Sequence, residues 1–289
     1  MPMTVEELLE EAEKKILDSS NVDLWRRSDA LVNAEELLSE ILGKTIETKH
    51  LDDAVPPAAA ARFRRSVERR AGGEPVALIL GYTEFRGMKL IVEPGTFVPR
   101  NSSELLAVKA IKRVKPKRSG VAVDVATGTG PVALAIAKAA TQASVLGLDI
   151  WAPSIKVARK NARQLSLTNV KFIESDMLKR LPKNLKGAVD VFTIHPPYVA
   201  KKAVKTLPKE IKDFEPAVSL TDNSVDGLGL VRTLAGEAPS WLRKGGWMLV
   251  EVSPDLARSV GTILRRAGFG DVRSEKDSLG ATRVISGRI

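Results

Sequence analysis

Residues 121–140, VAVDVATGTGPVALAIAKAA, contain the pattern that decides the fold. A short apolar run, Val121–Ala126, is followed by Gly128 and Gly130 and then by the start of a helical pattern. Because glycine has no Cβ, a glycine-rich turn between a strand and a helix lets the backbone approach a ligand closely. Many α/β proteins carry such a loop, so it predicts a ligand-binding unit without identifying the ligand.

The same rhythm continues around this loop. From about residue 100, short apolar runs alternate with amphipathic segments, which is typical of an α/β fold with a doubly wound parallel sheet. The expected strands are 121–126, 144–150, 170–173, 189–194, 247–252 and two runs near 272 and 283–285, and the expected helices are 104–114, 132–140, 154–165, 228–242 and 255–267.

The N-terminal part shows helical periodicity instead. Thr4 and Glu7 fit a capping box, and apolar residues then recur at helical spacing. Three apolar runs broken by glycine follow and suggest a β-hairpin; they are 76–80, 82–85 and 88–92. We therefore expect three parts: a helical substrate-recognition domain at 1–75, a β-hairpin linker at 76–99 and the α/β domain at 100–289.

The composition excludes several kinds of site. The chain of 289 residues has no cysteine and only two histidines, His50 and His195, so thiolate and multi-histidine metal sites are excluded and no metal is expected. The N-terminus has no apolar signal core, and no apolar run approaches the roughly 18 residues of a membrane span. We expect a cytoplasmic protein without membrane association. The net charge of +10 favours anionic partners, nucleic acid among them, while the oligomeric state is not indicated.

Two carboxylates follow the next two predicted strands. Asp149 lies 21 positions after Gly128 (149 − 128), where a carboxylate can accept hydrogen bonds from both hydroxyls of a ribose. Asp176, after the third strand, can accept from an adenine amino group. A helix cap and a turn are the alternative roles of these two residues. Dinucleotides are the rival ligands, but Pro131 follows Gly130, so the Gly-x-Gly-x-x-Gly spacing of a pyrophosphate site is absent.

The fourth predicted strand runs into His195-Pro196-Pro197-Tyr198. Two prolines fix the backbone and lack N–H donors, so the turn offers carbonyl oxygens that can only accept hydrogen bonds. Such a turn suits a substrate nitrogen that bears hydrogens, with its lone pair oriented toward a methyl donor. Tyr198 offers an aromatic face to a planar amide or base. A tight loop without a chemical role is the alternative.

Together these motifs resemble the protein-glutamine methyltransferases of the HemK/PrmC family, which modify peptide-chain release factors. The resemblance extends over nearly the whole chain, with further family patterns at 81–100, 214–217, 226–228, 245–251 and 277–284. It implies a helical N-terminal domain, a Rossmann-like seven-stranded methyltransferase domain, S-adenosylmethionine as cofactor and methylation of a glutamine amide in a Gly-Gly-Gln loop.

The resemblance also implies roles for individual residues. The resemblance implies that residues 124–130, the cofactor loop, face the methionine part of the cofactor. It also implies that Asp149 holds the ribose and that Asp176 lies near adenine. The implied cofactor-binding residues are Asp124, Ala126, Thr127, Gly128, Gly130, Asp149, Asp176 and His195, and the implied catalytic residues are His195, Pro196 and Tyr198.

Three places depart from the family pattern. His195 stands where the family has asparagine, and a neutral imidazole offers one donor and one acceptor with a different reach and direction. It can keep the acceptor role or serve as a base for a more acidic nucleophile. Ala126 stands where the family loop usually has glycine. Residues 101–104, Asn-Ser-Ser-Glu, replace the family's Pro-Asp/Glu-Thr-Glu.

Three hypotheses about function follow. The first is an S-adenosylmethionine-dependent N-methyltransferase that acts on a side-chain amide of a protein, such as a release factor. The second keeps the enzyme but changes the acceptor to an exocyclic amine of RNA or DNA, or to a small metabolite. The third is a binding protein on the same fold that has lost catalysis through His195 and Ala126.

Overall fold

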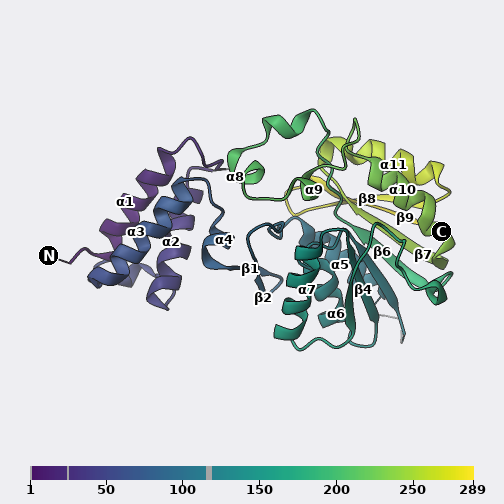
Figure 1. Cartoon of the computed structure of the whole chain (residues 1–289), viewed down its shortest axis with the longest axis horizontal. Helices are drawn as coiled ribbons and strands as arrows, with labels where there is room; N and C mark the ends of the chain where they lie inside the picture. The colour runs from purple at the N-terminus through teal and green to yellow at the C-terminus, as the bar shows by residue number, and fades with distance from the viewer. Residues whose placement is uncertain (1, 25, 115–118) are drawn as a thin grey trace. The chain divides into compact units, whose positions relative to one another are not determined.

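The computed structural model describes residues 2–24, 26–114 and 119–289 (Figure 1). The chain divides into two compact units, Met1–Tyr82 with Lys205–Glu215, and Thr83–Val204 with Pro216–Ile289. The smaller unit therefore continues past the expected boundary at residue 75 and includes a segment from much later in the sequence. No helix of the described residues is both long enough and apolar enough to cross a membrane.

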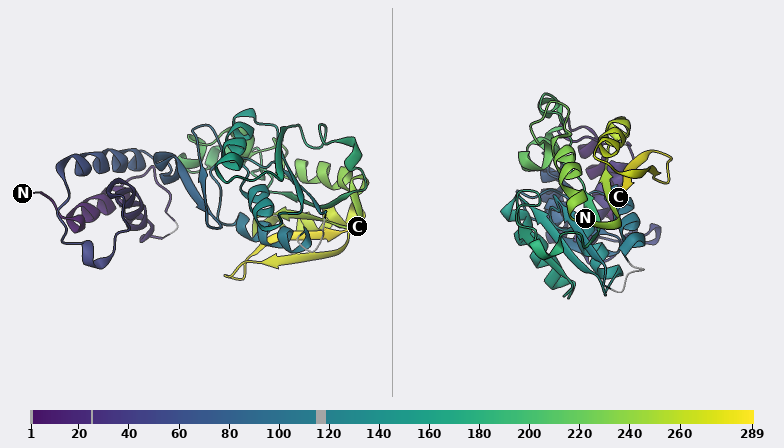
Figure 2. Two further views of the ribbon diagram at one scale, coloured as in Figure 1. Left: turned by 90° about the horizontal axis from the view of Figure 1, so that it is seen from below. Right: turned by 90° about the vertical axis from the view of Figure 1, so that its right-hand side faces the viewer.

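The smaller unit is a helical bundle. Its main helices are α1 (Val5–Leu17), α2 (Asp29–Leu42) and α3 (Pro57–Ala71), which pack on one another (Figure 2). The capping box predicted at the start of α1 is confirmed, because Thr4 and Glu7 each accept a hydrogen bond from the backbone N–H of the other. The apolar faces meet in one core, with Leu8, Leu37 and Phe63 almost fully buried.

A buried arginine attaches the later segment to this bundle. Arg70, at the end of α3, is only 5% exposed. Its Nη2 lies 2.8 Å from Oε2 of Glu210, in the short helix α8 (Lys209–Lys212), and its Nε donates to Oδ1 of Asn33 in α2. A buried guanidinium needs such partners, since an unpaired buried charge is costly.

Only two of the three apolar runs at 76–92 form the predicted hairpin. Val76–Leu80 is the short helix α4, so its expected place in the hairpin was wrong. The helix begins after Pro75 and ends at Gly81, which has a positive φ of 79° and donates its N–H to the carbonyl of Ala77. The hairpin consists of β1 (Tyr82–Phe85) and β2 (Met88–Ile91), joined by a two-residue turn.

The larger unit contains a seven-stranded sheet with the order β5-β4-β3-β6-β7-β9-β8. This confirms the predicted α/β fold with a Rossmann-like seven-stranded domain. The strands are β3 (Val121–Val125), β4 (Ser144–Asp149), β5 (Val170–Glu174), β6 (Val189–Ile194), β7 (Leu242–Glu251), β8 (Gly270–Lys276) and β9 (Thr282–Arg288). The helices are α5 (Ser103–Val114), α6 (Pro131–Ala139), α7 (Ala152–Gln164), α9 (Ala217–Leu220), α10 (Gly229–Glu237) and α11 (Ala257–Arg266).

The alternating pattern predicted a wholly parallel sheet, and this prediction was wrong for one strand. Strands β3 to β7 pair in parallel, but β9 lies between β7 and β8 and runs antiparallel to both. The reason is the connection between β8 and β9, residues 277–281. A parallel crossover needs about a dozen residues, so a loop this short forces a hairpin.

Alternating side chains of the strands bury the two faces of the sheet in separate cores. Ala122 packs with α5, α6 and α7, whereas Val123 and Val125 pack with α10 and α11 (Figure 1). Strand β3 has β4 on one side and β6 on the other. From β3 the chain first adds β4 and β5 toward one edge of the sheet and then adds β6 and β7 toward the other edge, so β3 lies at the switch point. In open α/β sheets, ligands bind at the carboxyl edge of such a switch point.

Candidate active site

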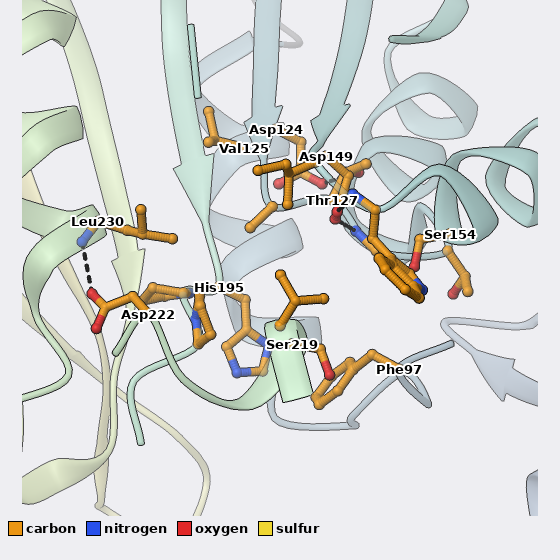
Figure 3. A pocket seen from close by; sticks show the side chains of 18 of the residues that line it. Phe97, Asp124, Val125, Thr127, Asp149, Ser154, His195, Ser219, Asp222 and Leu230 are labelled. Atoms are coloured by element: carbon orange, nitrogen blue, oxygen red, sulfur yellow. Dashed lines mark hydrogen bonds between the residues drawn. The ribbon is translucent and has the colours of Figure 1, made fainter. Parts of the chain in front are cut away.

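A cavity of about 270 Å³ lies at the carboxyl edge of β3, β4 and β6 (Figure 3). Figure 3 places Asp124, Thr127 and Asp149 on one side of it, and His195 with Phe97 on the other. The predicted site residues that line the cavity are Asp124, Ala126, Thr127, Gly128, Asp149, Asp176, His195 and Pro196. Gly130 and Tyr198 do not line it.

Asp124 is a buried carboxylate at the end of β3, 2% exposed. Its Oδ2 accepts a hydrogen bond from Thr127 Oγ1 and its Oδ1 accepts one from Thr193 Oγ1, each at 2.6 Å. Burial raises the pKa of Asp124 to about 6, and the two hydroxyl donors oppose that rise. At neutral pH Asp124 is therefore ionised although its burial disfavours the negative charge.

The cofactor loop needs unusual backbone angles. Ala126 has a φ of +52° and Gly128 a φ of +56°, the left-handed region that favours glycine. Ala126 is thus strained at the position where the resemblance implies glycine. Gly130 is required by space as well, because a Cβ there would lie 2.8 Å from Cζ of Phe172.

Asp149, at the end of β4, is joined to the cofactor loop. Its Oδ2 accepts from the backbone N–H of Gly128 at 2.7 Å, and its Oδ1 accepts from that of Trp151 at 2.8 Å. Burial raises the pKa of Asp149, while these backbone hydrogen bonds lower it. A carboxylate has about four lone-pair sites, so each oxygen keeps capacity for a ligand hydroxyl.

An aromatic side chain missed by the sequence reasoning lies next to Asp149. Trp151 lines the cavity, and its indole N–H donates to the carbonyl of Gly95 at 2.8 Å. Phe97 lines the cavity as well. The aromatic residue two positions after Asp149 was the available signal, since a flat ring near a predicted ribose site can pack against a base.

Asp176 occupies a more open position. Its side chain is 47% exposed and forms an ion pair with Lys179 through Oδ2. It lines the cavity together with Ser175 and Met177. The contact of Asp176 with adenine therefore stays a prediction. If formed, it involves a carboxylate that is exposed in this structure.

The His195-Pro196-Pro197 turn follows β6 at the opposite side of the cavity. The imidazole of His195 stacks on the ring of Tyr198, with centroids 5.6 Å apart, and meets the edge of Phe97 at the same centroid distance. Tyr198 thus lies behind His195, not in the cavity. Its predicted stacking on the acceptor group stays untested, and the geometry assigns it a contact with His195.

Three residues that the sequence reasoning gave no role contact His195 or its partner. Ser103 Oγ lies 3.2 Å from His195 Nδ1, and Glu251 Oε2 lies 3.5 Å from the same nitrogen. Ser102 Oγ donates to the other oxygen of Glu251 at 2.8 Å. Ser102 and Ser103 belong to the segment that departs from the family pattern, which was the available signal.

The segment around α9 and its following loop forms another wall. Ser219 and Asp222 line the cavity, and Asp222 Oδ2 accepts from the backbone N–H of Leu230. Tyr198 forms an isolated β-bridge with Thr221. The bridge between Tyr198 and Thr221, together with the hydrogen bond from the N–H of Val199 to the carbonyl of Leu220, links this wall to the turn after β6.

Two parts of the sequence match family models, the PrmC N-terminal domain at residues 7–81 and a methyltransferase domain at 116–260. The chain is 31% identical over 280 residues to the release factor glutamine methyltransferase of Geobacter sulfurreducens, covering 96% of each. It is 34% identical to that of Burkholderia pseudomallei, covering 90% of this chain and 92% of the relative. The crystal structure of a release factor-specific protein-(glutamine-N5) methyltransferase from Alicyclobacillus acidocaldarius matches at 25% identity with a TM-score of 0.41, covering 68% of this chain and 97% of that one.

Proposed function

The chain belongs to the release factor glutamine methyltransferase (HemK/PrmC) family, and from this membership we propose that it methylates a glutamine side-chain amide of a peptide-chain release factor, with S-adenosylmethionine as methyl donor. The observation that carries the proposal is one cavity shared by Asp149, at the end of β4, and by the His195-Pro196 turn, at the end of β6. A cofactor site and an acceptor site in one cavity are what direct transfer requires.

The residues that line the cavity fit the ribose, the base and the positive charge of the cofactor. When bound, S-adenosylmethionine supplies a methyl group on a positively charged sulfur. Asp149 uses its remaining lone pairs to accept from the ribose hydroxyls, and Phe97 and Trp151 offer apolar surface to the base. Asp124 and Asp176 add negative charge to the lining, which suits a cationic ligand.

The turn after β6 orients the acceptor nitrogen. Pro196 and Pro197 are buried and cannot donate from the backbone, so their carbonyl oxygens and His195 accept from the two amide hydrogens of the substrate. Tyr198 acts through His195, as a positioning residue.

The protein is tested with methyl-labelled S-adenosylmethionine and a release factor that has an intact Gly-Gly-Gln loop. The matched control is the same factor with that glutamine replaced by alanine, and a parallel sample contains RNA. Label on the intact factor alone supports the proposal. Label on the RNA would move the acceptor to an exocyclic amine, which the net charge of +10 would favour. No label on either, with the cofactor bound, would refute the proposal. The cytoplasmic location stays a prediction.

A further inference from the structure

His195, which replaces the asparagine of the family pattern, contacts Ser103, which keeps the hydroxyl of the family's threonine. Ser103 begins α5 and His195 follows β6, 92 residues later, yet Ser103 Oγ lies 3.2 Å from His195 Nδ1. The serine and the histidine therefore form one polar cluster beside the cavity that both of them line. Which of the two groups donates in this contact depends on where the proton of the imidazole lies.

Glu251 is the third member of this cluster. It ends β7 and is 2% exposed. Its Oε1 accepts from Ser102, whereas Oε2 has no hydrogen-bond partner among the described residues and lies 3.5 Å from His195 Nδ1. A buried carboxylate oxygen without a donor is costly, so a proton on Nδ1 is what this oxygen requires.

The second ring nitrogen is left for the cavity. His195 lines the cavity, and its side chain is 15% exposed. Within residues 2–24, 26–114 and 119–289, no side chain or backbone group forms a hydrogen bond with Nε2. With the proton on Nδ1, Nε2 carries a lone pair and can only accept.

Taking the proposed function as its basis, we propose that Glu251 is a positioning residue that fixes the Nδ1–H tautomer of His195, with Ser103 Oγ as a second acceptor for that N–H, so that Nε2 accepts a hydrogen bond from the acceptor nitrogen and then takes its proton. The nitrogen lone pair forms the new bond to the methyl carbon, and sulfur keeps the electron pair of the broken C–S bond. The nitrogen, now positively charged, releases one N–H proton to Nε2. Glu251 then stabilises the imidazolium.

This role differs from what an asparagine at the same position can do. An amide oxygen accepts a hydrogen bond but is too weak a base to hold a proton at neutral pH, whereas imidazole does so readily. The substitution thus adds a proton acceptor to the acceptor turn. General-base assistance of this kind contributes roughly 100- to 10,000-fold to a rate.

The two histidines of the chain provide an internal comparison for the tautomer. His50 Nδ1 accepts from the backbone N–H of Glu47 at 3.1 Å, so its proton must lie on Nε2. Long-range ¹⁵N–¹H correlation of the imidazoles, in buffer alkaline enough to keep both rings neutral, distinguishes the two tautomers. We expect Nδ1–H for His195 and Nε2–H for His50. The same Nε2–H pattern in both would overturn the proposal.

Glu251→Gln tests the role of the carboxylate. With the amide oxygen on Ser102, the amide NH₂ donates to Nδ1 and Nε2 loses its lone pair. With the NH₂ on Ser102, which can also accept, the amide oxygen still accepts from Nδ1–H but carries no charge that stabilises the imidazolium. In both orientations we expect kcat to fall, roughly 100-fold, with KM for the cofactor little changed.

The control is the same substitution in a His195→Asn background, since asparagine has no tautomer to lose. There we expect Glu251→Gln to reduce kcat by less than about tenfold, which leaves a large coupling between the two positions. An equal loss in both backgrounds would refute the positioning role. If no release factor is methylated at all, the spectra still decide the tautomer, so failure of the proposed function is recognised separately.

Discussion

Replacement of Asp124 by asparagine is expected to stabilise the protein at neutral pH. The carboxylate is 2% exposed, and its hydrogen-bond donors are the hydroxyls of Thr127 and Thr193 and the backbone N–H of Ala133. No cation pairs with it in the described residues. Asparagine has nearly the same shape and no charge. Its amide can accept from one of Thr127 and Thr193 and donate to the other, because a hydroxyl can do either.

The magnitude follows from the pKa of Asp124, which burial raises from 3.8 to about 6. Each pH unit of difference between the folded and unfolded pKa is worth about 1.4 kcal/mol, so the ionised residue costs about 3 kcal/mol above pH 7. Since the folded pKa is the higher one, the folded state binds the proton more tightly. The free energy of unfolding of the natural protein therefore falls by about 3 kcal/mol as pH rises from about 4 to above 6.

Urea unfolding followed by tryptophan fluorescence measures this effect, because three of the four tryptophans, Trp151, Trp241 and Trp247, belong to the larger unit. The free energy of unfolding of Asp124→Asn minus that of the natural protein should be near zero at pH 4 and about 3 kcal/mol at pH 7.5. A difference that does not change with pH, or a variant less stable above pH 6, would refute the reasoning. We also expect weaker binding of the cationic cofactor, since the variant lacks a negative charge at the cavity.

Three backbone predictions follow from the same unit. Ala126→Gly should raise the free energy of unfolding by about 0.5–1 kcal/mol, because it relieves a left-handed alanine at some cost in unfolded-state entropy; equal or lower stability would contradict this. Gly130→Ala should lower it by roughly 1–3 kcal/mol and weaken cofactor binding in calorimetry, because its Cβ would clash with Phe172; unchanged affinity would contradict this. Gly227→Ala places a Cβ 2.0 Å from the carbonyl oxygen of Tyr198, so kcat should fall roughly 100-fold through displacement of the acceptor turn, and a kcat near that of the natural protein would contradict this.

Local patterns in the sequence predicted most of the fold. The capping box at Thr4, the strand 189–194 and the glycine-rich turn all depend on residues close in sequence. The five apolar residues of α4 gave no periodicity, and only the flanking Pro75 and Gly81 signalled a helix. The antiparallel β9 was missed because alternation of strands and helices does not show how short the last connection is.

The candidate site was predictable where its chemistry lies at strand ends. Gly128 and Asp149 follow adjacent parallel strands, so their contact follows from the topology. The cluster of Ser102, Glu251 and His195 was not predictable in this way. Ser102 lies 149 positions from Glu251, and Ser103 lies 92 positions from His195. Hydrogen bonds between polar side chains at such separations depend on how the sheet and helix pack.

The most direct test of the account is to map the transferred methyl group by tandem mass spectrometry of a release factor incubated with the protein and S-adenosylmethionine. We predict one added methyl group on the side-chain nitrogen of the glutamine in the Gly-Gly-Gln loop, and a strongly reduced yield with Glu251→Gln. A methyl group on another residue, or an unmodified factor in the presence of bound cofactor, would contradict the assignment of this cavity to glutamine methylation.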